Sequence, residues 1–126
     1  MLRAIRCSSV PITVNQVHYN LAVRDAADEL MALCKENQVI FQAWRPLRDL
    51  QETETTRMIA QKHGISFAQL ALAWILNQEN TAALTAMKNP LHIPQTLAAL
   101  DIRLTSEEMN LLEQYPFRAP CTVTLK

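Results

Sequence analysis

The feature that most constrains the fold is a short apolar run from Val39 to Trp44, which Pro46 ends. Only Gln42 interrupts it. A run of this length, bounded by turn signals, is typical of a strand, and near-continuous hydrophobicity is typical of a parallel strand covered on both faces. We therefore predict an α/β fold with this strand inside a parallel sheet.

Further strands and helices are predicted on both sides of this run. The β-α-β-α-α-β-α order favours a parallel sheet with right-handed crossovers. Nothing repeats at a fixed period. The other two predicted strands are residues 12–19 and Thr81–Met87. Five helices are predicted: Asp25–Asn37, Glu52–His63, one that follows Ser66, a short one that begins at Pro90 or His92 and ends at Leu97, and Ser106–Gln114.

Helix ends carry clear local signals. The single glycine, Gly64, is a helix C-terminal signal, and His63 before it is favoured there by the helix dipole. Ser66 with Gln69, and Thr105 with Glu108, fit capping boxes at two helix starts. The apolar stretch 70–76, which includes Trp74, predicts the best-buried helix.

Composition excludes several classes of function. Twelve basic and twelve acidic side chains in 126 residues give no reason to expect nucleic acid or an anionic membrane as a partner. No apolar run is long enough to span a bilayer, and residues 1–6 are too poor in apolar residues for a secretory signal. A glycine-rich phosphate loop needs more than one glycine, so phosphate recognition would have to use helix N-termini and side chains.

Cysteine and histidine usage argues against disulfides and metals. Three cysteines at wide spacing, with no CxxC pair, indicate reduced thiols in a cytoplasm rather than a disulfide framework or a zinc site. The histidines show no metal-ligand spacing. We expect Cys34 to be a small core residue. Cys121 lies in the tail, where an exposed and reactive thiol is the less favoured of two interpretations. The residues concerned are Cys7, Cys34, Cys121, His18, His63 and His92.

Several motifs together resemble the aldo-keto reductases, bacterial members most closely. The segment Val14–Asn20 reads VNQVHYN, and residues 43–47 read AWRPL. Residues 59–74 read IAQKHGISFAQLALAW, and the stretch 89–108 matches the last strand–helix unit of that family. The resemblance covers about residues 10–117. It implies part of a (β/α)8 barrel, since a complete barrel takes about 250 residues.

This resemblance implies chemistry whose central residues have no match here. In the family a tyrosine donates a proton to a carbonyl while NADPH gives a hydride, and a lysine, an aspartate and a histidine assist. All four come from the first half of the barrel, and no stretch of this sequence matches their surroundings. Neither Tyr19 nor Tyr115 occupies the catalytic position. We therefore assign no catalytic residue and expect no activity from the chain alone.

Residues toward the nicotinamide end of an NADP cofactor do have matches. By resemblance, Gln16 contacts the nicotinamide carboxamide and Trp44 stacks on the ring, where the family usually has a tyrosine. Arg45 and Leu47 lie where the family's loop touches the pyrophosphate. The simpler structural readings stay open: Gln16 would satisfy backbone groups at a strand end, and Trp44 would be a core residue.

The adenosine end matches less well. The family commonly reads Ile-Pro-Lys-Ala or Ile-Pro-Gly-Ala where this chain has Leu84-Thr85-Ala86-Met87. Ala86 then stands where the lysine type pairs with the 2′-phosphate, so NADPH binding should be weakened. Gln95 and the residue after it stand where the family has a Glu-Asn pair that holds the adenine. Lys88 and His92 are the candidates to supply positive charge in place of the missing lysine.

These observations combine into one expectation. Residues 1–126 form a single domain, a half-barrel of three parallel strands with helices outside. Its open inner face and strand edges favour a homo-oligomer, most simply a two-fold dimer, or a complementing N-terminal half. The function is that of a truncated NADP-dependent carbonyl oxidoreductase, inactive alone. The alternatives are a nucleotide-binding remnant without catalysis and an oligomeric interaction module without a ligand.

Overall fold

A three-stranded parallel sheet forms the centre of the chain. The computed structural model describes residues 7–24 and 27–116. Strands β1 (Val14–His18), β2 (Ile40–Trp44) and β3 (Thr81–Leu84) are hydrogen-bonded in the order β1-β2-β3, all parallel. The predicted α/β class and the three parallel strands are confirmed. Strand β3 ends at Leu84 rather than at Met87, because the chain leaves the edge of the sheet there and pairs no further with β2.

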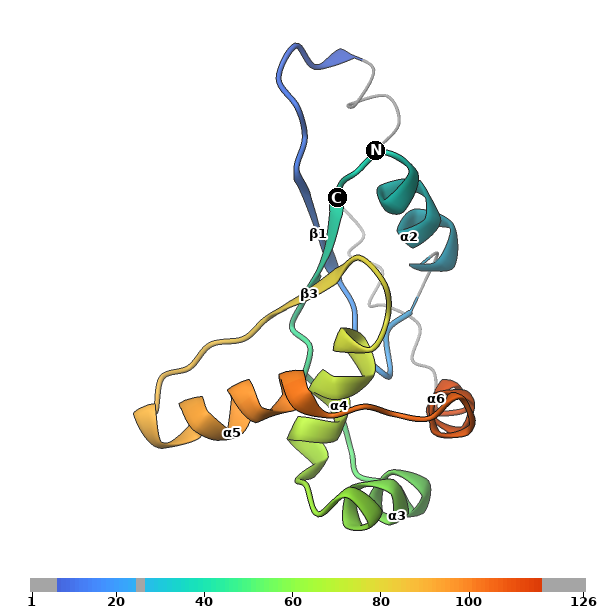
Figure 1. The fold of residues 1–126 in the computed structure, drawn as a ribbon, viewed down its shortest axis with the longest axis vertical. Coiled ribbons are helices and arrows are strands. Elements are labelled where there is room, and N and C mark those ends of the chain that lie inside the picture. Colours follow the sequence, from blue (N-terminus) through green and yellow to red (C-terminus); the bar gives the residue numbers. More distant parts are fainter. Residues whose placement is uncertain (1–6, 25–26, 117–126) are drawn as a thin grey trace, which may run out of the picture.

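Helices connect and cover the strands. Figure 1 shows α2 to the right of the strands and α3, α4 and α5 filling the lower part of the molecule. Helix α4 contacts β3, α3 and α5, so it is the element around which the others pack. The helical elements are α2 (Ala27–Glu36), α3 (Glu54–His63), α4 (Phe67–Leu76), η1 (Pro90–His92), α5 (Ile93–Ala98), η2 (Ala99–Asp101) and α6 (Ser106–Glu113).

Three predicted helix ends are confirmed, whereas α3 starts at Glu54 rather than at the predicted Glu52, because Thr53 caps it. Gly64 ends α3 in the left-handed conformation, at φ 64°, and Ser66 caps α4 with Gln69 in a reciprocal capping box. Thr105 forms the same box with Glu108 at the start of α6. A third box, between Thr53 and Thr56, escaped prediction because threonine replaces the usual Glu or Gln at its third position.

The core lies between the helices and one face of the sheet. Trp74, 2% exposed, stacks on Tyr19 with ring centroids 5.2 Å apart, and Tyr19 meets Phe41 edge-on. Cys34 is fully buried, as expected of a small core residue. The strongly apolar α4 contributes an unbroken buried run from Leu70 to Ile75.

In residues 7–24 and 27–116, side chains cover one face of the sheet and leave much of the other face exposed. In β2, Phe41 and Ala43 are fully buried, whereas Ile40 and Trp44, which point to the other face, are 42% and 39% exposed. Val14 beside Ile40 and Leu84 beside Trp44 are similarly exposed. The expectation that β2 is buried on both faces is therefore wrong for this chain by itself. The open face has an apolar row at each end.

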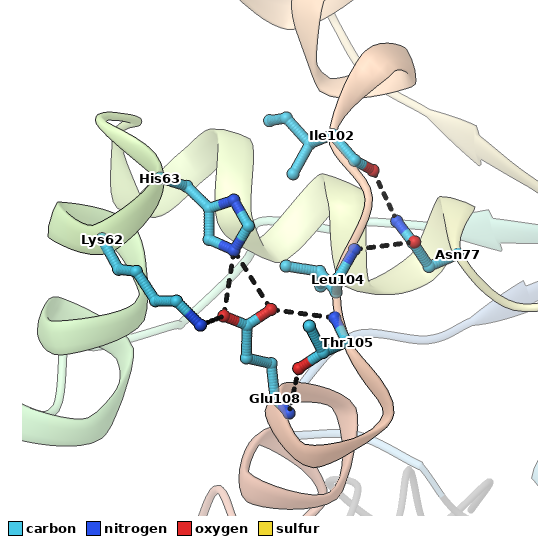
Figure 2. A network of polar contacts seen from close by, with 7 residues as sticks. All are labelled: Lys62, His63, Asn77, Ile102, Leu104, Thr105 and Glu108. Atoms are coloured by element: carbon cyan, nitrogen blue, oxygen red, sulfur yellow. Dashed lines mark hydrogen bonds and ion pairs between the residues drawn. The ribbon is translucent and has the colours of Figure 1, made fainter.

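A buried carboxylate, that of Glu108, joins α6 to α3 (Figure 2). Glu108 accepts from the Lys62 ammonium at 2.7 Å and from the Thr105 backbone N–H at 2.9 Å, and contacts His63. Burial alone would raise the pKa of Glu108, but these hydrogen bonds outweigh it and lower the pKa to about 2. Asn77 holds the loop that precedes α6. Its side-chain NH₂ donates to the Ile102 carbonyl, and its side-chain oxygen accepts from the Leu104 N–H.

Some expectations fall on residues outside the described ranges. The predicted helix start at Asp25, the tail after Pro116 and Cys121 lie there. Within residues 7–24 and 27–116, no helix is long and apolar enough to cross a membrane.

Candidate functional site

A cavity of about 370 Å³ lies where the loop after β3 meets the N-terminal ends of α4 and α5. Four of the predicted site residues line it: Leu47, Lys88, His92 and Gln95. They come from two separate parts of the chain, which the fold brings together. Ala86, where the resemblance leads one to expect a lysine, also lines the cavity.

A second cavity of about 400 Å³ adjoins the first. Trp44, Arg45 and Leu84 line it, and Leu47 and Ala86 line both cavities. The two cavities therefore lie side by side, and we call them together the groove: Trp44 lines one of them, Lys88 and His92 line the other, and Leu47 lines both. One end presents an aromatic ring and the other end basic and polar side chains.

The Trp44 ring is flanked on two sides. The Arg45 guanidinium carbon lies over it, 4.2 Å from the ring centroid, and the His18 ring meets it edge-on at 5.6 Å. Burial lowers the pKa of His18, and the positive charge of Arg45 acts in the same direction. His18 is therefore favoured as the neutral ring, and its Nε2 has no hydrogen-bond partner among the described residues.

Asn20, which sequence reasoning did not single out, holds the loop that carries Arg45. It is fully buried, and its side-chain NH₂ donates to the backbone carbonyls of Arg45 at 3.0 Å and Arg48 at 3.2 Å. Its side-chain oxygen accepts from the N–H groups of Ala22 and Val23. These bonds hold a loop in which Arg45 has a φ of 54°, a conformation that non-glycine residues adopt only with support.

Residues at the polar end of the groove are also positioned by hydrogen bonds. The Gln69 amide donates to the Gln95 carbonyl at 2.9 Å, which ties α5 to the start of α4. A ring nitrogen of His92 lies 3.4 Å from the side-chain oxygen of Gln95. Lys88 has no ion-pair partner in residues 7–24 or 27–116, so its charge is available to an anion in the cavity.

Gln16 stands apart from the groove. It lies on the open face of the sheet, opposite Gln42 in the strand register, and its side-chain NH₂ donates to the Gln42 side-chain oxygen at 2.8 Å. It lines neither cavity of the groove. A ligand that reaches from the groove to Gln16 must pass over Trp44, which follows Gln42 by two positions on the same face.

Neither tyrosine is placed for acid catalysis. Tyr19 is 3% exposed and donates to Gln78, and burial raises the pKa of its phenol to about 12. The hydroxyl of Tyr115 donates to the Gln51 carbonyl and accepts from the Gln51 N–H. In the part of the chain that the structure describes, no three His, Cys, Asp or Glu side chains are grouped to hold a metal ion.

Comparison with known proteins decides the family. The sequence model of the aldo/keto reductase family matches residues 48–115, which are more than half of the chain. The chain belongs to the aldo/keto reductase family. The matched segment includes α3 to α6 and β3, and so the polar end of the groove.

Two relatives match most of the chain. Methylglyoxal reductase YeaE of Escherichia coli is 31% identical in an alignment of 110 positions that spans 81% of this chain and 39% of YeaE. Protein REDOX 2 of Catharanthus roseus is 27% identical in an alignment of 127 positions that spans 94% of this chain and 38% of that protein. The chain thus spans about two fifths of the length of these relatives.

Solved aldo-keto reductases share the fold. The thermostable enzyme Tm1743, solved with the inhibitor epalrestat, superposes with a TM-score of 0.82 at 37% identity, covering 89% of this chain and 43% of that one. An aldo-keto reductase of Klebsiella pneumoniae, solved with NADPH, gives 0.74 at 34% identity, covering 84% and 40%. The three strands and their helices are therefore part of an aldo-keto reductase barrel, as predicted.

Proposed function

We propose that this chain supplies the cofactor-binding side of an NADP-dependent carbonyl oxidoreductase that acts in the cytoplasm. The groove from Trp44 to Lys88 carries this proposal, because a flat aromatic surface and basic side chains line two adjoining cavities. Aldo-keto reductase structures from Klebsiella pneumoniae have been solved with NADPH and with NADP, which supports the assignment of the ligand.

Each part of the groove has a role toward the nucleotide. Trp44 offers a ring face for stacking, and Arg45 offers a guanidinium suited to a pyrophosphate. Lys88 and His92 provide charge at the far end, in place of the lysine that Ala86 replaces. Gln16 donates one amide N–H to Gln42, and its second N–H and its side-chain oxygen can bond a carboxamide. When bound, NADPH supplies the hydride.

Among residues 7–24 and 27–116, neither tyrosine lines the groove, where it could donate the proton for carbonyl reduction. Both tyrosines are buried and hydrogen-bonded in the core, away from the groove. We therefore propose that the chain alone binds cofactor without reducing a carbonyl, and that residues from the remainder of a barrel must complete the site. Methylglyoxal is a suitable test substrate, since YeaE is a methylglyoxal reductase.

The open face of the sheet also requires a cover. We propose that a second copy of the chain covers it in solution when no complementing half is present. The apolar rows at both ends of the face and the free edges of β1 and β3 support this, since exposed edges and apolar faces favour association.

Calorimetric titration with NADPH tests the proposed function. We expect micromolar binding that weakens about tenfold in Lys88→Ala, because one charge-assisted bond is lost. Lys35→Ala is the matched control, an exposed lysine of α2 remote from the groove, and should bind as the unmodified chain does. Absence of heat up to millimolar NADPH would contradict the proposal. Methylglyoxal reduction by the purified chain would contradict the predicted need for a completing half.

A further inference from the structure

We propose that Arg45 is an anion-responsive cover on the Trp44 ring, which leaves the ring when it binds a phosphate group and so frees a face for stacking. The proposal rests on the proposed function. The guanidinium carbon lies 4.2 Å from the ring centroid, where a flat ligand ring stacked on that face would have to lie. A stacked ring and the guanidinium cannot share that face.

The Arg45 side chain is free to exchange one contact for another. It is exposed, and within residues 7–24 and 27–116 no carboxylate or hydrogen-bond acceptor holds its guanidinium. Its backbone, by contrast, is fixed by the bond from Asn20 to its carbonyl. The side chain can therefore swing away from Trp44 while the loop keeps its shape.

The chemistry of the two contacts sets the direction of the exchange. An exposed cation–π contact is weak, whereas a guanidinium makes paired charge-assisted hydrogen bonds to phosphate oxygens. A dinucleotide brings both a pyrophosphate and a flat ring to the groove. Its phosphates would draw Arg45 off the indole, and its ring would then take the uncovered face of Trp44.

Arg48 provides an internal comparison. It belongs to the same loop and is also exposed, but it pairs with Asp49 at 3.5 Å and does not cover a ring. Removal of its charge changes the electrostatics of the loop as much as removal of the Arg45 charge does. A difference between the two variants therefore reports the Arg45–Trp44 contact.

The test measures collisional quenching of Trp44 fluorescence by N-methylnicotinamide, with and without inorganic pyrophosphate at constant ionic strength. The Trp44→Phe variant supplies the background, since the other tryptophan, Trp74, is 2% exposed. In the unmodified chain, pyrophosphate should raise the quenching constant about twofold, because the ring face that Arg45 covers is released. Arg45→Gln should show the higher constant without pyrophosphate and no further rise, and Arg48→Gln should behave as the unmodified chain does.

Two outcomes would overturn the proposal, and a parallel titration with NADP⁺ separates them. If NADP⁺ binds but pyrophosphate leaves Trp44 quenching unchanged, Arg45 is not a cover, and the proposed function stands. If neither anion binds, both proposals fail. The response of the unmodified chain to pyrophosphate is sufficient for this decision even if Arg45→Gln folds poorly.

Discussion

His63 at the end of α3 contacts both carboxylate oxygens of Glu108 at the start of α6, at 3.0 and 3.1 Å (Figure 2). The two residues are 45 positions apart in the sequence. Glu108 also closes the capping box of α6, so a single carboxylate both starts one helix and fastens it to another.

Removal of the Glu108 side chain should destabilise the fold. We expect Glu108→Ala to lower the free energy of unfolding by about 2–4 kcal/mol, because the cap and the contacts to α3 are lost together. Glu108→Gln keeps a capping amide but loses the charge, and should cost about 2 kcal/mol. Urea unfolding followed by tryptophan fluorescence measures both.

The exposed neighbour Glu107 is the control. Glu107→Gln should change the free energy of unfolding by less than about 0.5 kcal/mol, and a loss equal to that of Glu108→Gln would refute the special role of Glu108.

The same carboxylate predicts a pH dependence. Its pKa is lowered from 4.5 to about 2 in the folded chain. A group with a lowered folded pKa stabilises above its unfolded pKa and loses that contribution as pH falls through the folded pKa. The stability advantage of the unmodified chain over Glu108→Gln should be constant above about pH 5 and vanish between pH 4.5 and 2, a change of at most about 3 kcal/mol. Parallel pH profiles of the two chains that never converge would contradict this.

Asn20 should matter for both stability and the groove. In Asn20→Ala the carbonyls of Arg45 and Arg48 and two backbone N–H groups lose their side-chain partner, so we expect a loss of about 2–4 kcal/mol and weaker pyrophosphate binding. Asn37→Ala is a matched control, since the Asn37 side chain donates to one carbonyl, that of Leu33, and should cost about 1 kcal/mol. Denaturant unfolding and calorimetry measure the two effects, and equal losses in both variants would disprove a special role for Asn20.

The open face of the sheet predicts self-association that a charge can disrupt. Ile40 lies on the central strand of this face, in the apolar row at one end, and is 42% exposed. Ile40→Lys should weaken a dimer at least about tenfold, because an unpaired charge would be buried. Leu91→Lys, a change at an apolar residue that is 78% exposed on η1, is the control and should leave association unchanged. Light scattering and sedimentation follow both. A monodisperse monomer of the unmodified chain at micromolar concentration would refute the proposed dimer.

Local signals determined much of the fold. Gly64 ends α3, and Ser66 and Thr105 start α4 and α6 where the sequence predicts them. These signals work because the hydrogen bonds that they form reach only three to five residues along the chain. The resemblance to aldo-keto reductases was similarly readable from the sequence, since it rests on short motifs in a fixed order.

The sequence by itself therefore determined the order of the elements, several helix ends, the family and the candidate residues of the groove. Only the tertiary structure decided which of those residues share a cavity: Leu47 lines one cavity with Lys88 and His92, whereas Gln16 bonds Gln42 on the open face. It alone revealed that Asn20 holds the Arg45 loop and that Glu108 joins α6 to α3. Such contacts join positions far apart in the sequence, and they form because packing of the helices on the sheet sets the distance between side chains, which no local pattern encodes.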